Sequence, residues 1–334
     1  MACHPWLGWL PPGCTRPSGV LQFSNARSTG MAAVEGSVAL VTGASRGIGR
    51  GIALQLAKAG AAVYITGRSE TVVTAAAAIS AASGTGGSGG TPGAGGSCVG
   101  VVVDHSDDDA VEALLVRIAR ERGRLDVLVN NAYSGVQGLH GEHAMQPFWS
   151  KPLAAWNDSC DVGLRSAYTC TALAARLLLV PAGRGLVVNV SSAGGLKYAG
   201  FVGDVAYGVG KAALDRLSND MATELRAHGV SCVSLWPGLV RTEVNESMRK
   251  LDTALAGDAA ESVEFSGAGV VALMRHPQMA ARWSGRVMMT TELAEEFGFT
   301  DPADGSVPRS MDAAALRRQM ARPPKWWSRP KPKL

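Results

Sequence analysis

The chain has 334 residues, 46% of them hydrophobic, which is long enough to bury one sizeable core. Its net charge of +4 comes from its two ends, because residues 317–334 carry seven Arg or Lys and residues 1–34 carry two Arg, with no acid in either segment. The remainder holds 23 basic and 28 acidic residues, and this mildly acidic balance argues against nucleic-acid binding.

Cysteine usage and hydropathy exclude further classes of protein. The six cysteines, at positions 3, 14, 98, 160, 170 and 232, show no paired spacing, which suits a reducing compartment and gives no metal site. No apolar run reaches the length that spans a bilayer.

Three segments of unusual composition divide the chain. Residues 1–34 lack helical periodicity and are either a targeting segment or an unstructured extension. Residues 35–310 are predicted to form a single domain. Within it, residues 83–97 contain eight Gly in fifteen positions and are predicted to be a flexible insert before the third strand. Residues 311–334 form a basic tail rich in Pro and Trp.

The first strand of the domain leads into a glycine-rich loop. Val38–Thr42 is a short apolar run typical of a buried strand, and glycines follow it at positions 43, 47 and 49. Gly47–Ala59 then has the apolar spacing of a helix. Strand, glycine loop and helix in this order are typical of a dinucleotide site, in which the helix N-terminus accepts a pyrophosphate. An ordinary strand-to-helix turn is the alternative.

The rest of the chain alternates strands and helices. Helices are predicted over 107–122, 150–180 and 205–228. This alternation predicts an α/β, Rossmann-type, doubly wound parallel sheet of seven strands in the order 3-2-1-4-5-6-7, with helices on both faces and ligands at the carboxyl edge. The six later strands are predicted at Ala62–Thr66, Val99–Val103, Asp126–Val129, Val187–Val190, Ser231–Leu235 and Arg286–Met289.

A Tyr and a Lys lie four residues apart in the helix predicted after the fifth strand. This spacing puts Tyr207 and Lys211 on one helix face, where the ammonium would favour the phenolate. A phenol with a pKa of about 10 can then exchange a proton near neutral pH. Surface pairing is the usual explanation of such a motif. Here it follows a dinucleotide loop and a strand that ends in Ser191–Ser192, and together these features favour a catalytic site.

These motifs together resemble those of the short-chain dehydrogenase/reductase family, over roughly residues 35 to 290. Asn130-Asn131-Ala132 is similar to the family's Asn-Asn-Ala-Gly motif, with Tyr133 in place of the Gly. Pro237-Gly238, with Thr242 four residues later, is similar to the family's loop on the nicotinamide side. The resemblance implies an oxidoreductase of this fold that uses NAD(P)(H).

The resemblance also implies roles for the catalytic residues. Tyr207 would transfer the proton, Lys211 would bind the nicotinamide ribose and lower the pKa of Tyr207, and Ser192 would bond the carbonyl oxygen. Ser191 is expected to be structural. The family's long helix usually carries an Asn, and the matching position here is Asp161, whose alternative role is an i,i+4 pair with Arg165. In a shifted register the candidate is Asn157. The cofactor-binding residues implied are Thr42, Gly43, Ser45, Arg46, Gly47, Ile48, Gly49, Arg68, Asp104, Asn130, Ala132, Tyr207, Lys211, Pro237, Gly238, Val240 and Thr242.

The end of the second strand indicates which cofactor is used. Thr66-Gly67-Arg68 offers no acid for the ribose 2′-hydroxyl of NAD, whereas Arg68, flanked by Arg46, can pair with a 2′-phosphate. We therefore expect NADP(H) rather than NAD(H), although two Arg also fit a solvated rim. Asp104 would meet the adenine amino group by family analogy, or cap the following helix.

The substrate is expected to be a hydrophobic ketone, aldehyde, quinone or steroid-like carbonyl. Tyr133, Trp149, Phe201 and Trp236 are candidates for an apolar pocket, and each is also a candidate for core packing. Ser192 lies fifteen residues before Tyr207, slightly more than is usual in the family, so a loop around residues 197–203 should reshape the pocket mouth. Residues 240–262 have the composition of a mobile lid.

Two other functions remain open from the sequence. One is NAD-dependent oxidation of a secondary alcohol, and the other is a non-catalytic cofactor-sensing or interaction protein. The intact Ser192, Tyr207 and Lys211 argue against the second. Self-association into a homo-oligomer is also left open.

The C-terminal tail, residues 311–334, suggests where in the cell the protein is found. Its basic residues and Trp326–Trp327 suit contact with an anionic membrane, and its final Pro-Lys-Leu resembles the peroxisomal signal Ser-Lys-Leu. A solvated tail on a cytoplasmic enzyme is the alternative, and residues 1–34 leave an organellar location open.

Overall fold

The computed structural model describes residues 33–84, 96–135, 146–198, 205–243, 260–309 and 312–321. The N-terminal extension, most of the glycine-rich insert, and the basic tail from residue 322 lie outside these ranges. So do most of the expected loop at 197–203, Phe201 included, and most of the expected lid at 240–262.

The described residues form one seven-stranded parallel sheet in the order β3-β2-β1-β4-β5-β6-β7, which confirms the predicted topology. Each strand was predicted to within two residues of its observed ends. The strands are β1 (Val38–Val41), β2 (Ala62–Gly67), β3 (Ser97–Val102), β4 (Val127–Asn130), β5 (Gly185–Val190), β6 (Val230–Trp236) and β7 (Val287–Met289).

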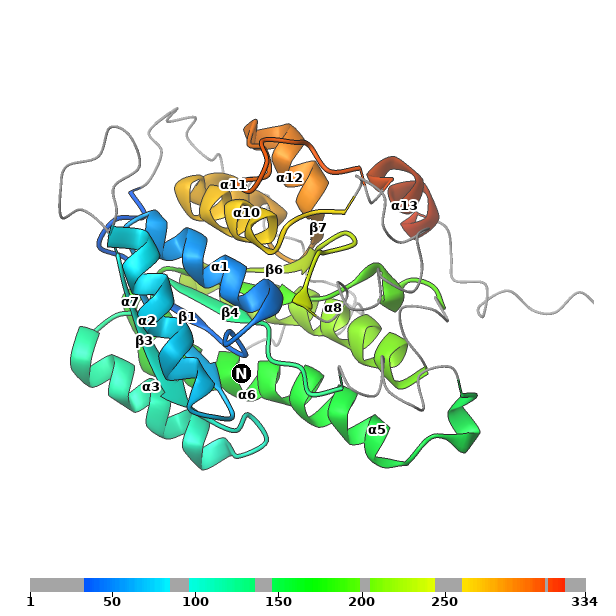
Figure 1. Cartoon of the computed structure of the whole chain (residues 1–334), viewed down its shortest axis with the longest axis horizontal. Coiled ribbons are helices and arrows are strands. Elements are labelled where there is room, and N and C mark those ends of the chain that lie inside the picture. The colour runs from blue at the N-terminus through cyan, green and yellow to red at the C-terminus, as the bar shows by residue number, and fades with distance from the viewer. Residues whose placement is uncertain are drawn as a thin grey trace, which may run out of the picture. The chain divides into compact units, whose positions relative to one another are not determined.

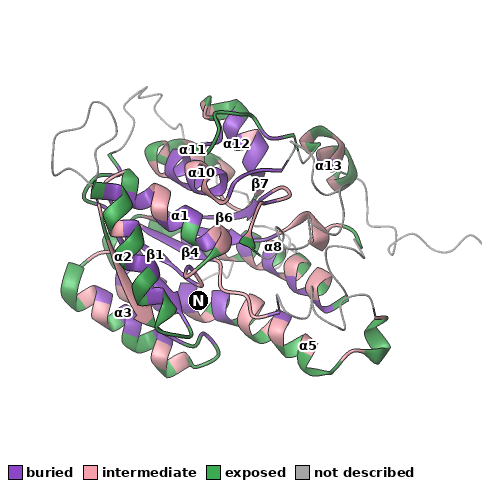
Figure 2. Cartoon of the chain, viewed as in Figure 1, coloured by how far each residue is buried: buried purple, intermediate pink, exposed green. Residues whose placement is uncertain are grey.

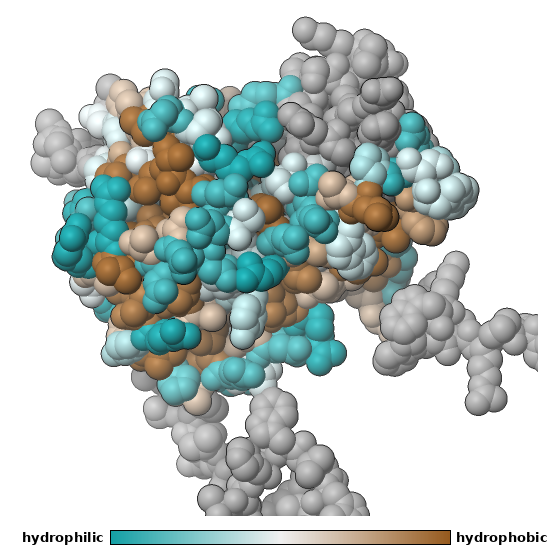
Figure 3. Space-filling model, turned by 90° about the horizontal axis from the view of Figure 1, so that it is seen from below, coloured by the Kyte–Doolittle hydropathy of each residue, from teal (hydrophilic) through white to brown (hydrophobic). Residues whose placement is uncertain are grey.

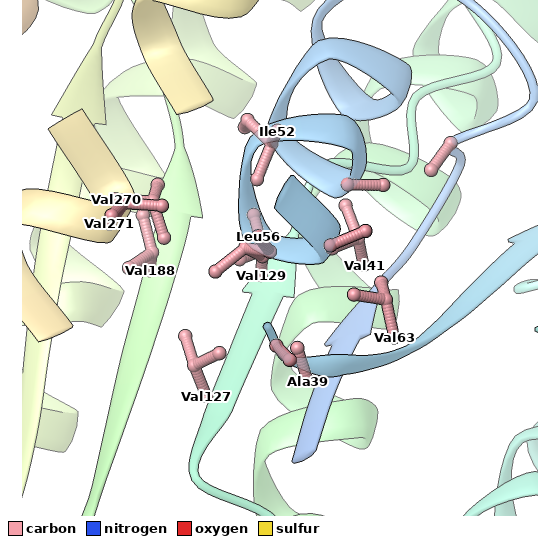
Figure 4. Packing of buried hydrophobic residues seen from close by; sticks show 14 of the residues in the cluster. Ala39, Val41, Ile52, Leu56, Val63, Val127, Val129, Val188, Val270 and Val271 are labelled. Atoms are coloured by element: carbon pink, nitrogen blue, oxygen red, sulfur yellow. The ribbon is translucent and has the colours of Figure 1, made fainter. Parts of the chain in front are cut away.

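Helices cover both faces of the sheet because alternate strand residues point to opposite sides. In β1, Ala39 and Val41 pack with Ile52 and Leu56 of α1, as Figure 4 shows. Val38 and Leu40 belong to a second core on the other face. The principal helices are α1 (Gly47–Lys58), α2 (Thr71–Gly84), α3 (Asp108–Arg122), α8 (Val205–Leu225), α10 (Val263–Arg275), α11 (Pro277–Trp283), α12 (Thr290–Phe297) and α13 (Ala313–Met320).

The two faces carry different helices. α1, α2 and α10 contribute to the core that contains Ala39, and α3 and α8 to the core that contains Val38. Figure 1 shows α1 and α10 on one side of the sheet and α3 on the other, with the strand ends between them. Buried residues concentrate in the strands and on the inner helix faces (Figure 2).

The long helix after β4 contains two π-helical stretches. It runs through α5 (Ala154–Asn157), the π-helix η2 (Asp158–Arg165), α6 (Ser166–Ala174), the π-helix η3 (Ala175–Leu179) and α7 (Val180–Ala182). A helix over 150–180 was predicted, but the π turns were not, because apolar spacing alone does not distinguish them from α-helix. Such turns are frequent at functional sites.

Some apolar side chains near this helix are exposed. Trp149 is 75% exposed and Leu153 92%, and both come just before or within the first turn of the helix. Figure 3, seen from below, shows brown apolar patches interrupted by polar residues. Within the described residues, no helix combines the length and the apolarity needed to cross a membrane.

The chain after β6 makes an excursion whose two ends, at Val240 and Glu261, lie next to each other. Val240 forms an isolated parallel bridge with Glu261. The Glu261 carboxylate is fully buried and accepts a hydrogen bond from Thr290 Oγ1 at 2.8 Å. Burial, chiefly, raises the pKa of Glu261 to about 7 despite bonds from Thr290, Gly238 N and Ser266.

The raised pKa of Glu261 predicts that unfolding stability depends on pH. The folded chain keeps this proton up to about pH 7, whereas the unfolded chain releases it near the ordinary glutamate pKa of 4.5, so this stability falls as pH rises between those values. Glu261→Gln should remove that dependence. In chemical denaturation, the wild type should lose about 1–3 kcal/mol more than the variant between pH 5 and pH 8.

Glu296→Gln, on the exposed side of α12, is the matched control and should behave like the wild type. A constant difference between wild type and Glu261→Gln across this pH range would contradict the assignment.

Candidate active site

A cleft of about 330 Å³ opens at the carboxyl edge of the sheet, where the topology places ligands. It brings together the glycine loop, the residues after β2 and β4, and the Tyr–Lys pair of α8. Its lining residues are Gly43, Ser45, Arg46, Gly47, Ile48, Gly67, Arg68, Val103, His105, Asn131, Ala132, Tyr133, Ser134, Val162, Val190, Ser191, Tyr207, Lys211, Thr242 and Glu243.

The glycine loop has no room for side chains at two positions. A Cβ on Gly43 would lie 2.7 Å from Ala132 Cα, and a Cβ on Gly49 would lie 2.3 Å from Asn131 Nδ2. Gly43 also adopts a φ of 63°, which L side chains disfavour. The loop therefore packs directly against the segment after β4 and leaves the N-terminus of α1 facing the cleft.

Thr42 and Asn131 join the glycine loop to the segment after β4. The backbone N–H groups of Asn131 and Ala132 both donate to Thr42 Oγ1, at 2.9 and 3.0 Å. Asn131 Nδ2 donates to the carbonyl oxygens of Thr42 and Gly43. Thr42 is 1% exposed, so it acts from beneath the site.

The structure separates the roles of the two adjacent Asn residues. Asn130, expected at the cofactor, is buried and donates from Nδ2 to Asn189 Oδ1 at 2.8 Å and to Thr171 Oγ1 at 3.0 Å. Asn131, which the sequence analysis did not place at the cofactor, lines the cleft. Neighbouring residues at a strand end point to opposite sides. The Asn-Asn pair could therefore have indicated that only one of the two faces the cleft.

Two arginines line the cleft. Arg46 precedes α1 and Arg68 follows β2. Asp104 is near Arg68, but hydrogen bonds from Ser106 are the main cause that lowers the pKa of Asp104. The cap of α3 is Asp107, which accepts from Ala110 N, so the alternative role of Asp104 as a helix cap is wrong.

A buried histidine supports the glycine loop from below. Gly43 N donates to Thr66 Oγ1 at 3.1 Å, and Thr66 Oγ1 lies 2.7 Å from His105 Nε2. Burial lowers the pKa of His105 to about 4, so the ring that is hydrogen-bonded to Thr66 is neutral at pH 7. The sequence analysis missed this residue, because a lone His gives no signal of its partners.

Tyr207 lines the cleft, and Ser192 lies beside it, outside the residues that line the cleft. Ser192 accepts from Gly194 N at 3.1 Å and is hydrogen-bonded to Tyr207. A Cβ on Gly194 would lie 2.7 Å from Tyr207 Cε1, so this glycine lets the ring approach. Burial raises the pKa of Tyr207, and the Ser192 bond opposes it. Tyr207 therefore holds its proton at neutral pH, in contrast to the expected shift toward phenolate.

Lys211 lies beneath Tyr207 on the same face of α8, as the spacing predicted. Its Nζ donates to Val190 O, at the end of β5, at 2.9 Å and lies 5.8 Å from the Tyr207 ring centroid. Burial lowers the pKa of Lys211 to about 8, and the charge of Asp215 opposes this shift. The amine is therefore mostly an ammonium at pH 7.

Asp215, which the sequence analysis missed, is the carboxylate that acts on Lys211. It accepts hydrogen bonds from Ser234 Oγ at 2.6 Å and from Trp236 Nε1 at 2.9 Å. Its position, four residues after Lys211, is the spacing that could have identified it. Ser191 donates to Lys211 O, which agrees with the structural role expected for it.

Asp161 occupies a different environment from the one expected. Its side chain is on the exposed side of η2, and Arg165 pairs with Asp108 instead of with Asp161. Asn157, the alternative, is also exposed. Asp161 lies in the π-helix η2, whose i+5 pattern apolar spacing does not reveal, and Asn157 ends the α-helical segment before it.

The aromatic residues expected at the substrate pocket divide into three groups. Tyr133 lines the cleft, Trp149 projects into solvent, and Trp236 is buried and bonded to Asp215. Trp149 lies in the short 3₁₀ turn Phe148–Ser150, and Trp236 ends the fully buried strand β6, which composition did not reveal. Phe201 is outside the described residues.

The segment after β6 reaches the glycine loop. Pro237 and Gly238 follow the strand, Gly238 N bonds Glu261, and Val240 is buried. Thr242 lines the cleft, and next to it Glu243 Oε2 accepts a hydrogen bond from Gly47 N at 3.1 Å. A carboxylate thus lies on the first N–H of α1, the position that suits a cofactor phosphate.

Within the described residues, no group of three His, Cys, Asp or Glu side chains is placed to hold a metal ion. A dinucleotide fits the site instead. The glycines that leave no space for a Cβ, and the Gly47 N–H at the start of α1, which can bind an anion, are the features such a group requires.

Comparisons with known proteins agree with this geometry. A family model described as short chain dehydrogenase matches residues 37–253. Dehydrogenase/reductase SDR family member 1 of Mus musculus is 49% identical over 282 residues, covering 81% of this chain and 85% of the relative. The 3beta-hydroxysteroid dehydrogenase of Mediterraneibacter gnavus is 33% identical over 225 residues, covering 67% and 74%.

A solved structure shows the same arrangement. A putative NAD(P) dependent gluconate 5-dehydrogenase from Beutenbergia cavernae, with bound NADP, aligns with a TM-score of 0.63 and 28% identity, covering 79% of this chain and 100% of that chain. The chain therefore belongs to the short-chain dehydrogenase family of oxidoreductases.

Proposed function

We propose that the protein reduces hydrophobic carbonyl compounds to alcohols with NADPH. The observation that carries this proposal is the position of Tyr207, hydrogen-bonded to Ser192 and with its ring beside Lys211 Nζ, on the wall of the same cleft as the glycine loop. A group that holds a proton at neutral pH suits the reductive direction, in which the substrate oxygen must receive one.

The cofactor would lie along the cleft between the two arginines and α8. The N–H groups at the start of α1 would bind its pyrophosphate, and Lys211 its nicotinamide ribose. The nicotinamide supplies the hydride when it is bound. Ser192 would orient the carbonyl oxygen, and Tyr207 would donate its proton to that oxygen as charge develops there.

The preference for NADPH rests on Arg68 and Arg46. Both line the end of the cleft that follows β2, where the chain has no acid to bind a ribose 2′-hydroxyl. Arginine pairs well with phosphate because its planar donors match the phosphate oxygens. The bound NADP of the Beutenbergia cavernae protein is in keeping with this choice.

A hydrophobic substrate is supported by Tyr133 and Val162 in the lining of the cleft. The similarity to a 3beta-hydroxysteroid dehydrogenase suits a ring-shaped, apolar substrate and keeps secondary-alcohol oxidation as the second candidate. Steady-state turnover with a panel of ketones, quinones and steroids, with NADPH, NADH and the oxidised cofactors, distinguishes the two directions.

Tyr207→Phe should reduce ketone turnover by about 10²–10⁴-fold, because only the proton-donating hydroxyl is lost. NADPH binding, measured by fluorescence titration, should be retained. Tyr168→Phe, on the exposed side of α6, is the control and should keep full turnover. Turnover by Tyr207→Phe within ten-fold of the wild type would show that another group donates the proton.

Arg68→Ala should weaken NADPH binding by roughly ten-fold or more, and NADH binding much less, because only NADPH carries the 2′-phosphate. Isothermal titration with both cofactors measures this difference. Arg176→Ala, on the exposed side of η3, is the control. Equal losses for the two cofactors would contradict the role of Arg68, and Arg46→Ala would then be the variant to measure.

Glu243→Gln should bind the cofactor roughly two- to five-fold more tightly at low salt, because the carboxylate on Gly47 N competes with the pyrophosphate and the amide lacks its charge. The gain should shrink as salt is added. Glu112→Gln on α3 is the control. Weaker binding by Glu243→Gln would mean that the carboxylate supports the cofactor instead of competing with it.

A further inference from the structure

Tyr133 packs against both members of the Tyr–Lys pair. It lies three residues after the end of β4, and its ring centroid is 5.8 Å from that of Tyr207, with the ring planes at 79°. Lys211 Nζ lies 5.3 Å from the Tyr133 centroid, closer than its 5.8 Å to the Tyr207 centroid. The ammonium therefore faces two aromatic rings that come from different parts of the chain.

The hydroxyl of Tyr133 is fixed to the π-helix. Tyr133 Oη and Ser159 Oγ lie 3.0 Å apart, and Ser159 is 4% exposed. Ser159 in turn packs on α8, because a Cβ on Gly210 would lie 3.2 Å from Ser159 O. The ring is thus held at one end by β4 and at the other by η2, which itself packs against the helix of the catalytic pair.

Two glycines make the room for this ring. A Cβ on Gly163, in η2, would lie 3.0 Å from Tyr133 Cδ2 and 3.3 Å from Cε2, and a Cβ on Gly135 would lie 2.5 Å from Tyr133 Oη. Neither glycine has a positive φ, so backbone conformation does not require it. Space for Tyr133 is the requirement that these positions share.

We propose that Tyr133 is a positioning residue for catalysis, whose ring holds the Lys211 ammonium in place and charged while Gly163 leaves the space for that ring. The proposal rests on the proposed function of the Tyr207–Lys211 pair. An aromatic face attracts an ammonium through the negative charge of its π-system, and more strongly where water is excluded. Tyr133 thereby offsets part of the cost of burying the lysine.

The charge of Lys211 is set by few groups in the described structure. Asp215 on its own helix favours the ammonium, the rings of Tyr207 and Tyr133 face it, and burial opposes it. Because burial lowers the pKa of Lys211 to about 8, a modest loss of support changes its charge in the physiological range. Substitution of Tyr133 removes one of the interactions that favour the Lys211 ammonium and leaves the others in place.

The test is the titration of Lys211 itself. In protein labelled with ¹³C-lysine, which has eight lysines, the Cε signal of Lys211 is assigned by its loss in Lys211→Arg and followed from pH 6 to pH 10. Tyr133→Leu keeps apolar volume without a π-system and should lower the pKa of Lys211 by about 0.5–1 unit. Tyr133→Phe keeps the ring and should stay within about 0.2 units of the wild type.

A second variant, Gly163→Ala, leaves Tyr133 in place and tests the same contact if Tyr133→Leu does not fold. Gly163→Ala places a methyl group against the ring and should displace it from the ammonium, giving a shift in the same direction. In the Tyr133→Leu background, Gly163→Ala should add almost nothing, because the displaced ring is already gone. Tyr168→Leu, on α6, is the control for losing a tyrosine and should not move the titration.

Activity provides an independent readout. The alkaline limb of the kcat/KM pH profile should move to lower pH in Tyr133→Leu and Gly163→Ala by the same amount as the Lys211 titration. An unchanged or raised Lys211 pKa in Tyr133→Leu would overturn the proposal, as would additive effects of the two substitutions. Failure of the proposed function shows separately, as turnover in Tyr207→Phe, and leaves the Lys211 titration readable.

Discussion

A partly buried lysine ammonium, that of Lys211, is the constraint on which the site depends. Removing such a charge from water is costly, so the surrounding structure must supply compensating interactions or the amine will lose its proton. Val190 O accepts its hydrogen bond, Asp215 provides the opposite charge, and Tyr133 and Tyr207 present their rings. These groups come from β5, α8 and the segment after β4, so the sheet must be assembled before the lysine is stabilised.

The cofactor cradle and the proton donor are linked by the sheet. Thr42 at the end of β1 bonds the backbone after β4, and that segment carries both Asn131, which holds the glycine loop, and Tyr133, which faces Lys211. Parallel neighbouring strands place these residues at one edge. The same few residues therefore determine where a dinucleotide would lie and where the proton donor meets the substrate.

Sequence reasoning succeeded where local patterns determine structure. Strand runs such as Val38–Thr42 predicted the sheet order, and the Tyr207–Lys211 spacing predicted one helix face, where Ser192 is hydrogen-bonded to Tyr207. It failed where tertiary packing decides. The π-helix turned Asp161 to the exposed side of η2, burial raised instead of lowered the pKa of Tyr207, and Asp215 became recognisable only from its partners. Tyr133 looked like one aromatic among several until Gly163 showed the space made for it.

Transfer of a hydride by the assembled site is the central claim, and isotope labelling in a single turnover tests it most directly. Enzyme loaded with NADPH that carries deuterium at the transferable C4 position is mixed with a hydrophobic ketone, and the alcohol is analysed by mass spectrometry. The account predicts an alcohol one mass unit heavier, with deuterium on the former carbonyl carbon and the hydroxyl proton exchangeable with solvent. No alcohol from any ketone of the panel, or an alcohol without deuterium, would contradict it.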